Sequence, residues 1–261
     1  MMPKFSPSQK EIVVISLGGS IINPGKIQVD FLKKFRRLIL KFLKRGYRFV
    51  IVAGGGKICR DYQKAASEIT KISDEDKDWI GIHATRLNAH LIRTIFKKEA
   101  YPIVLDNPLK QINGGNYNVF IGSGWRPGWS TDYDAVLLAE RFKARKIINA
   151  SNIDYVYEKD PHTKIWCGGK RAKPIKEITW AKYCKLIGSK WKPGMKVPID
   201  PIAARLASKL KMTIIVTKGT NLKNLEQILK NKNLLAPPVG GARQNLEYSV
   251  FKKFKGTIIK P

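Results

Sequence analysis

The sequence predicts an α/β protein, a three-layer αβα sandwich with a mainly parallel central sheet. Continuous apolar segments of the kind found in strands buried on both faces alternate with segments whose apolar residues recur at helical spacing. Such alternation predicts a parallel sheet covered by helices on both faces. The 261 residues show no linker and no internal repeat, so we expect one domain over 1–261.

The first half of the chain shows the pattern most clearly. An apolar strand is predicted at 12–17 and ends in Gly18-Gly19-Ser20. A helix follows over about 31–43, with Asp30 as its expected N-cap. A second apolar strand at 49–53 also ends in glycines, at 54–56. These segments form a strand–helix–strand unit.

The alternation continues toward the C-terminus. Asp200-Pro201 and Asn221 are each expected to begin a helix. The core therefore covers about 11–230 plus a C-terminal strand at 256–260, and the segment 231–255, with its Pro-Pro and Gly-Gly pairs, is expected to be an irregular insertion. The other expected elements are helices at 79–97 and 132–142, and strands at 101–105, 119–121, 146–149 and 213–217.

Composition limits the classes of function. No apolar run approaches the ~20 residues of a membrane-spanning helix, and the first ten residues lack a signal-peptide core, so we expect a cytoplasmic protein without a membrane partner. The three cysteines and three histidines are not spaced as a metal site. The 49 Lys and Arg against 20 Asp and Glu give a formal charge of +29, which attracts polyanions, nucleic acid included. A lysine-rich composition spread over the whole surface is the alternative explanation.

The two glycine turns are the first candidate functional feature. Both follow apolar strands, where a parallel sheet binds its ligands. Glycines let a phosphate approach the main chain, and a following helix N-terminus favours an anion. Arg60, one helical turn beyond the second glycine turn, offers a guanidinium to phosphate oxygens. Ordinary tight turns and a solvated arginine are the alternatives. A Walker A loop and a G-x-G-x-x-G motif are both absent.

Further polar segments lie after later strands. Asp78 begins an apolar segment and is interpreted as a helix cap or a ligand contact. The segment 124–132, GWRPGWSTD, leads into a helix that Asp132 would cap, and its tryptophans either stack on a base or pack. The segment 151–161 follows a further strand as a loop and hairpin, and Tyr157 offers a ring to a purine.

Seven segments together resemble the amino acid kinase superfamily, and within it the UMP kinases of the archaeal type. They occur in family order and span nearly the whole chain: SLGGS (16–20), VAGGGKICR (52–60), DWIGIHATRLNA (78–89), PGWSTDYDAVLLAE (127–140), NIDYVYEKDP (152–161), IDPIAARLA (199–207) and GTII (256–259). The resemblance implies an amino acid kinase-like fold. It also implies transfer of the ATP γ-phosphate to UMP, with Mg²⁺ between the β- and γ-phosphates and a homo-oligomer, commonly a hexamer.

The resemblance also implies roles for individual residues. The catalytic group would be Arg60, Asp132 and Ser16. The UMP-binding residues would be Gly54, Gly55, Asp78, Trp125, Arg126, Pro127, Gly128, Trp129, Ser130 and Thr131. The ATP-binding residues would be Gly18, Gly19, Ser20, Gly56, Arg60, Ser151, Asn152, Tyr157 and Asp160.

The chain departs from the family pattern at three places. Ser16 stands where many members carry a lysine, and Lys57, Arg126 and Lys196 are the candidate replacements. Tyr155 replaces the glycine of a D-G-V-Y motif, and Trp125 replaces a small hydroxyl residue. Another small-molecule kinase of the superfamily, such as an isopentenyl phosphate, carbamate or acetylglutamate kinase, is one alternative function. A non-catalytic homologue that binds nucleotides, oxyanions or nucleic acid is the other.

Overall fold

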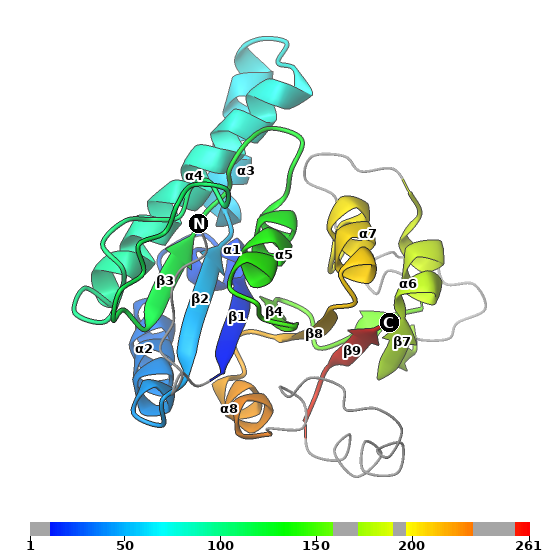
Figure 1. The fold of residues 1–261 in the computed structure, drawn as a ribbon. Coiled ribbons are helices and arrows are strands. Elements are labelled where there is room, and N and C mark those ends of the chain that lie inside the picture. The colour runs from blue at the N-terminus through cyan, green and yellow to red at the C-terminus, as the bar shows by residue number, and fades with distance from the viewer. Residues whose placement is uncertain (1–10, 159–171, 190–196, 232–253) are drawn as a thin grey trace.

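The computed structural model describes residues 11–158, 172–189, 197–231 and 254–261. These ranges form a seven-stranded sheet in the order β3-β2-β1-β4-β8-β9-β7 (Figure 1). The strands are β1 (Ile12–Leu17), β2 (Arg48–Ala53), β3 (Val119–Gly122), β4 (Lys146–Ser151), β7 (Glu177–Thr179), β8 (Thr213–Lys218) and β9 (Thr257–Lys260). A separate hairpin pairs β5 (Val156–Tyr157) with β6 (Pro174–Ile175).

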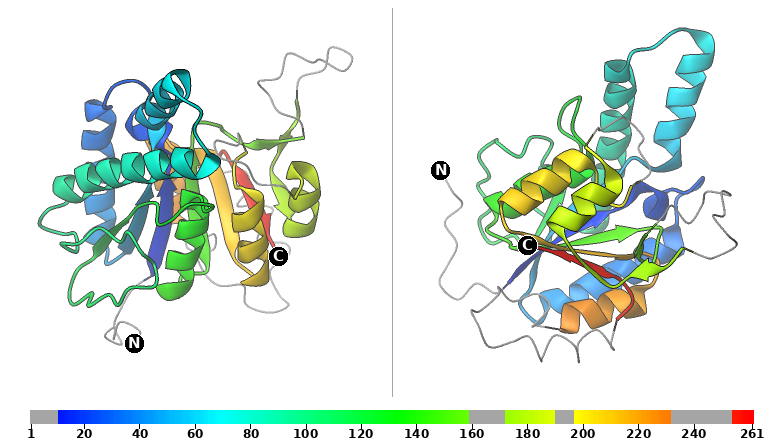
Figure 2. Two further views of the ribbon diagram at one scale, coloured as in Figure 1. Left: turned by 90° about the horizontal axis from the view of Figure 1, so that it is seen from above. Right: turned by 90° about the vertical axis from the view of Figure 1, so that its right-hand side faces the viewer.

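Helices cover both faces of the sheet, which confirms the three-layer αβα prediction. The helices are α1 (Gly19–Ile22), α2 (Val29–Leu43), α3 (Gly56–Ile69), α4 (Asp74–Ile95), α5 (Thr131–Arg141), α6 (Trp180–Ile187), α7 (Pro201–Lys209) and α8 (Leu222–Lys230). One apolar core joins α2, α4 and α8 to the sheet, and a second joins α5, α6 and α7 to its other face. Figure 2 shows α2 and α8 side by side below the sheet. The α3–α4 hairpin extends beyond the sheet edge (Figure 1).

The sheet is parallel over the strands that matter for the site. β1 pairs in parallel with β2 on one side and β4 on the other, with Leu17 opposite Ala53 and Ala150. The carboxyl ends of the three strands therefore meet at one edge, which brings their following turns together. The reversed strands are β9, antiparallel to β8, and β7, which runs with β9.

Several sequence predictions of local structure were correct. Asp200 caps α7 by accepting hydrogen bonds from Ile202 and Ala203, and Pro201 occupies the first turn. The side chain of Asn221 caps α8. Of the hairpin expected within 151–161, β5 lies in that segment, and its partner strand β6 lies beyond it.

Others were wrong. The expected strand at 101–105 is reduced to isolated bridges at Ala100 and Leu105, because Pro102 has no N–H for a ladder. Gln28 occupies the N-cap of α2, and Asp30 lies inside the first turn.

Of the expected insertion at 231–255, residues 232–253 lie outside the described part of the chain. Among the described residues, no helix has both the length and the apolar character needed to cross a bilayer.

Candidate functional site

The two glycine turns touch one another at the carboxyl edge of the sheet. A Cβ atom built on Gly19 would lie 2.0 Å from the amide nitrogen of Gly56 and 2.6 Å from the carbonyl carbon of Gly54. A Cβ atom on Gly54 would lie 2.5 Å from the amide nitrogen of Gly19. Contacts this short with backbone atoms leave no room for a side chain, so the approach of the two turns requires glycine.

The backbone amides of the turns divide into two groups. The amides of Gly18 and Gly54 donate to the carbonyls of Ala150 and Leu17, at 2.9 and 3.0 Å, and so join neighbouring strands. α1 begins at Gly19 and α3 begins at Gly56. The first amides of a helix have no intrahelical acceptor, and the dipole of a helix is positive at this end. The two helix starts therefore present adjacent anion-binding backbone.

A cavity of about 950 Å³ lies over both turns. The UMP-side residues predicted from the sequence that line it are Gly54, Gly55, Asp78, Trp129, Ser130 and Thr131. Ser16, Arg60 and Asp132 line it too, as do the predicted ATP-side residues Gly18, Gly19, Ser20, Gly56, Ser151, Asn152 and Tyr157. Trp125, Arg126, Pro127 and Gly128 are not among its lining residues. Asp160 lies outside the described residues.

Arg60 is the single lysine or arginine that lines this cavity in the described part of the chain. Lys57 pairs with Asp61 on the surface, at 2.7 Å. The guanidinium of Arg126 stacks on the rings of Trp125 and Trp129, 4.7 and 4.0 Å from their centroids. Lys196 lies outside the described residues. Neither Lys57 nor Arg126 lines the cavity in this structure.

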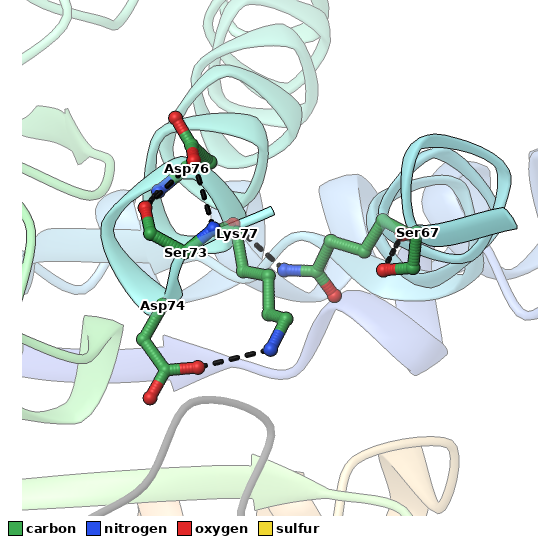
Figure 3. A network of polar contacts seen from close by, with 6 residues as sticks. Ser67, Ser73, Asp74, Asp76 and Lys77 are labelled. Carbon is green, nitrogen blue, oxygen red and sulfur yellow. Dashed lines mark hydrogen bonds and ion pairs between the residues drawn. The ribbon is translucent and has the colours of Figure 1, made fainter. Parts of the chain in front are cut away.

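Asp78 lies in the second turn of α4, five residues after the helix N-cap, and is not a cap itself. The helix begins at Ser73 with a capping box, in which Ser73 and Asp76 each bond the other's backbone amide. Figure 3 shows this pair beside the Lys77–Asp74 ion pair. These contacts fix the start of α4, so that Asp78 accepts a hydrogen bond from the Gly128 amide at 2.7 Å. Burial raises the pKa of Asp78.

The loop between β3 and α5 is held from both neighbouring helices. From α4, Thr85 accepts the amide of Gly124 at 2.8 Å, and Arg86 donates to the carbonyl of Trp125 at 3.3 Å. From α5, Asp134 accepts the amide of Trp125 at 3.2 Å. Together with the Asp78 contact, these bonds define the path of the loop before any ligand enters.

The tryptophans of this loop pack on one another. Trp125 and Trp129 meet edge to face at 4.7 Å between ring centroids, and Trp129 meets Tyr133 at 4.3 Å. Only Trp129 of these two tryptophans also lines the cavity. Packing therefore accounts for Trp125, while Trp129 presents a surface to a ligand.

Three carboxyl groups lie together at the cavity, of which Asp132 and Asp200 line it and Asp134 does not. Asp132 accepts hydrogen bonds from Ser16 at 3.0 Å and from Asn149 at 2.9 Å. Asp200 accepts a short hydrogen bond from Ser130. Burial, with the charge of Asp200, raises the pKa of Asp132 to about 7. The helix N-cap expected at Asp132 is Ser130 instead, whose hydroxyl accepts the Tyr133 amide.

The third carboxyl group, Asp134, is fully buried. Its Oδ1 atom has no hydrogen-bond partner, and burial raises its pKa to about 8. At neutral pH the side chain is therefore largely uncharged. Its Oδ2 atom still accepts the Trp125 amide, so a neutral carboxyl group supports the loop.

Sequence reasoning missed five residues that build the site. Asn88 donates to the carbonyls of Gly54 and Gly55, at 2.7 and 3.0 Å, and so fixes the second glycine turn. The other four are Thr85, Asp134, Asn149 and Asp200, of which Asp200 was predicted as a cap alone. Asn149 interrupts an apolar strand, and Asp134 interrupts an apolar helix face. A polar residue within an apolar segment was the sequence signal that could have identified these two as site residues.

The buried carboxyl groups make stability depend on pH. Because the pKa of Asp134 is higher in the folded chain than the usual value near 4, its contribution is fully present below pH ~4. It is lost as pH rises through about 8. We expect the free energy of unfolding to fall between pH 5 and 8, by up to ~1.4 kcal/mol per pH unit for each such group.

Asp134→Asn removes the titrating proton and keeps an acceptor for the Trp125 amide. Urea unfolding at several pH values should show that the free energy of unfolding of this variant depends less steeply on pH. Asp30→Asn, at an exposed carboxyl group in α2, is the control and should keep the pH dependence of the wild type. If the pH dependence of Asp134→Asn equals that of the wild type, Asp134 is ionised over the whole pH range tested, which would contradict the account.

Comparisons with known proteins identify the family. Residues 11–218 match the family model described as "Amino acid kinase family". A relative from Thermococcus kodakarensis, named uridylate kinase, is 30% identical over 230 residues, which cover 85% of this chain and 96% of the relative. A uridylate kinase from Thermoplasma acidophilum is 33% identical over 223 residues, covering 84% and 93% of the two chains.

Solved structures show the same fold. The uridylate kinase from Archaeoglobus fulgidus aligns with a TM-score of 0.67 at 28% identity, over 96% of this chain and all of that one. A UMP kinase from Ureaplasma parvum aligns with a TM-score of 0.69 at 20% identity, over 97% of this chain and all of the other, which supports the fold alone. On the family match and these relatives, the chain belongs to the amino acid kinase family.

Proposed function

We propose that this chain transfers the γ-phosphate of ATP to UMP, giving UDP and ADP. The observation that carries the proposal is the pair of touching glycine turns under one cavity, since two phosphorylated ligands must meet there. The relatives named uridylate kinase support UMP as the acceptor. An oxygen of the UMP phosphate attacks the γ-phosphorus, the bond to the bridging oxygen breaks, and ADP leaves.

We assign the acceptor side to the second turn and the loop before α5. Gly54 and Gly55 would lie against the UMP phosphate, and Asp78 would contact the ribose. The loop 125–131 would enclose the uracil, with Trp129 presenting its ring to the cavity. Trp125, Arg126, Pro127 and Gly128 act in this proposal by shaping the loop, since they do not line the cavity.

We assign the donor side to the first turn and the segment after β4. Gly18, Gly19, Ser20, Gly56 and Arg60 would surround the ATP phosphates. Ser151, Asn152 and Tyr157 would surround the adenosine, and all three line the same cavity. Asp160 stays a prediction for the adenosine side.

The chemistry requires positioning and charge neutralisation more than proton transfer. A UMP phosphate oxygen is already a nucleophile near neutral pH, so no strong general base is needed. Helix-start amides from α1 and α3, with the Arg60 guanidinium, supply positive potential where charge develops. Ser16 and Asn149 orient the Asp132 carboxyl group toward this region through their hydrogen bonds.

The residues present fit a Mg²⁺ ion that arrives with ATP. Mg²⁺ in kinases is held by phosphates and one or two carboxylates. Both side-chain hydrogen bonds of Asp132 end on Oδ1, and the neighbouring Asn149 Oδ1 is buried without a partner. A nearby cation would also favour the ionised form of Asp132. When bound, the ion would neutralise charge on the β- and γ-phosphates.

We also propose a cytoplasmic enzyme that assembles from several copies, with a hexamer as the arrangement that the resemblance implies. Apolar side chains on the α3–α4 hairpin support association. Ile69 is 85% exposed, Tyr62 is 65% exposed and Leu87 is 60% exposed. A second copy would remove these surfaces from water.

A nucleotide panel tests the acceptor. ADP release with ATP and UMP, CMP, dUMP, GMP or carbamate should show a clear preference for UMP. Asp78→Ala removes both the proposed ribose contact and the Gly128 bond, so kcat/KM for UMP should fall by at least ~10-fold. Glu75→Ala, at an exposed carboxylate on the same helix, is the control. Equal rates for all acceptors, or a preference for carbamate, would contradict UMP as the substrate.

A second test addresses the touching turns. Gly19→Ala places a methyl group against the backbone of Gly54 and Gly56, so kcat/KM should fall by at least ~100-fold. Gly25→Ala is the matched control, since its added Cβ would meet only the Lys57 side chain at 3.5 Å. Circular dichroism would establish that both variants fold. Wild-type activity in folded Gly19→Ala would contradict the proposed site.

A further inference from the structure

The positive charge of the chain is unevenly distributed over its helices. Residues 29–46, which form α2 and the following turn, carry seven lysines and arginines and one carboxylate. The α3–α4 hairpin, by contrast, carries six basic and six acidic residues over its two helices. Residues 205–230, which include α8, are also basic, with six lysines and arginines and one carboxylate.

Three of the seven basic side chains in residues 29–46, Lys34, Arg37 and Lys41, line a groove that α8 completes. The groove has a volume of about 280 Å³. It is lined by two leucines, four basic residues and one carboxylate: Leu38, Leu222, Lys34, Arg37, Lys41, Lys223 and Glu226. It shares no lining residue with the cavity over the glycine turns. The two helices lie side by side on the sheet face opposite α6 and α7 (Figure 2).

The negative charge of the carboxylate in the groove is already balanced by two lysines. Glu226 accepts hydrogen bonds from Lys41 at 2.7 Å and Lys230 at 2.9 Å, and these lower its pKa to about 2. Lys34, Arg37 and Lys223 form no ion pair with any residue that the structure describes. The groove therefore keeps several cations available to an external anion.

The spacing of these cations suits a repeating anion. Lys34 and Arg37 lie three residues apart on one face of α2, and Lys223 lies across the groove on α8. At 1.5 Å per residue, Lys34 and Arg37 are ~4.5 Å apart along the helix axis. Phosphates of a stacked strand recur every ~3.4 Å along its axis, so neighbouring phosphates can contact the two side chains.

We propose that the groove between α2 and α8 binds the phosphodiester backbone of a single-stranded nucleic acid. The apolar face of α2 is buried in the core and is not free to enter a membrane, which favours a strand over a lipid surface. Leu38 and Leu222 offer apolar contact to sugars. Among the described residues no aromatic side chain lines the groove, so binding is independent of base sequence.

Salt dependence of binding is the direct test. A fluorescent 20-nucleotide single strand of mixed sequence is titrated with the full-length protein by anisotropy, at several salt concentrations. The groove variant combines Lys34→Gln, Arg37→Gln and Lys223→Gln. Because each neutralised phosphate adds ~0.7 to the log–log slope for single strands, the variant should lose about 2 units of slope.

The control variant removes the same charge elsewhere. It combines Lys98→Gln, Lys182→Gln and Lys209→Gln, three exposed lysines outside the groove. Its slope should stay within ~0.5 of the wild type. Saturating ATP and UMP should leave binding unchanged in all three proteins, and phosphoryl transfer by the groove variant should match the wild type.

Four results would overturn the proposal. The first is an absence of binding at 50 mM salt. The second is an equal loss in the groove and control variants of the slope of log affinity against log salt concentration, which would assign binding to net charge. Competition by ATP and UMP would assign it to the nucleotide cavity. Binding of polyglutamate or of a DNA duplex in preference to the single strand would assign the groove to another partner. None of these results would bear on the proposed kinase activity, because the two sites share no residue.

Discussion

The contact between the backbones of two turns is the constraint on which the rest of the site depends. β1 and β2 are neighbours in a parallel sheet, so the turns that follow them leave at the same edge and must pass each other closely. Gly19 and Gly54 allow that passage because neither has a side chain. As a result, α1 and α3 begin side by side below one cavity. Phosphoryl transfer needs two ligands held together in line, which neighbouring anion-binding turns allow.

The surrounding residues keep this arrangement in one geometry. The side-chain amide of Asn88 donates to the carbonyls of the second glycine turn. Asp78 on α4 and Asp134 on α5 each accept a backbone amide of the β3–α5 loop. Buried polar groups of this kind specify a unique structure only when they are paired, and most of these are. Among the described residues that build the site, the exceptions are Asp134 Oδ1, Asn149 Oδ1 and Arg86 Nε. Their presence is consistent with a site whose polar atoms are completed by ligands and protons.

The sequence was sufficient for the fold and for most of the cavity, for identifiable reasons. Apolar strands ending in glycines are local patterns, so the α/β class and both turns could be predicted. Contacts between distant residues could not: nothing in the sequence around Asn88 indicates that its amide reaches Gly54, 34 positions earlier. The loop 125–128 was assigned to the ligand as a block, whereas the structure turns Arg126 onto the tryptophan rings. The reversed strand β9 was also outside reach, because strand direction depends on how the chain returns to the sheet.

A crystal structure of the protein with UMP and a non-hydrolysable ATP analogue tests the central claim most directly. The account predicts the UMP phosphate against Gly54 and Gly55, the γ-phosphate analogue against Gly19 and Ser20, and the two phosphorus atoms close enough for in-line transfer. Nucleotides bound in separate places, or glycine turns that part by several ångströms when the ligands bind, would contradict it.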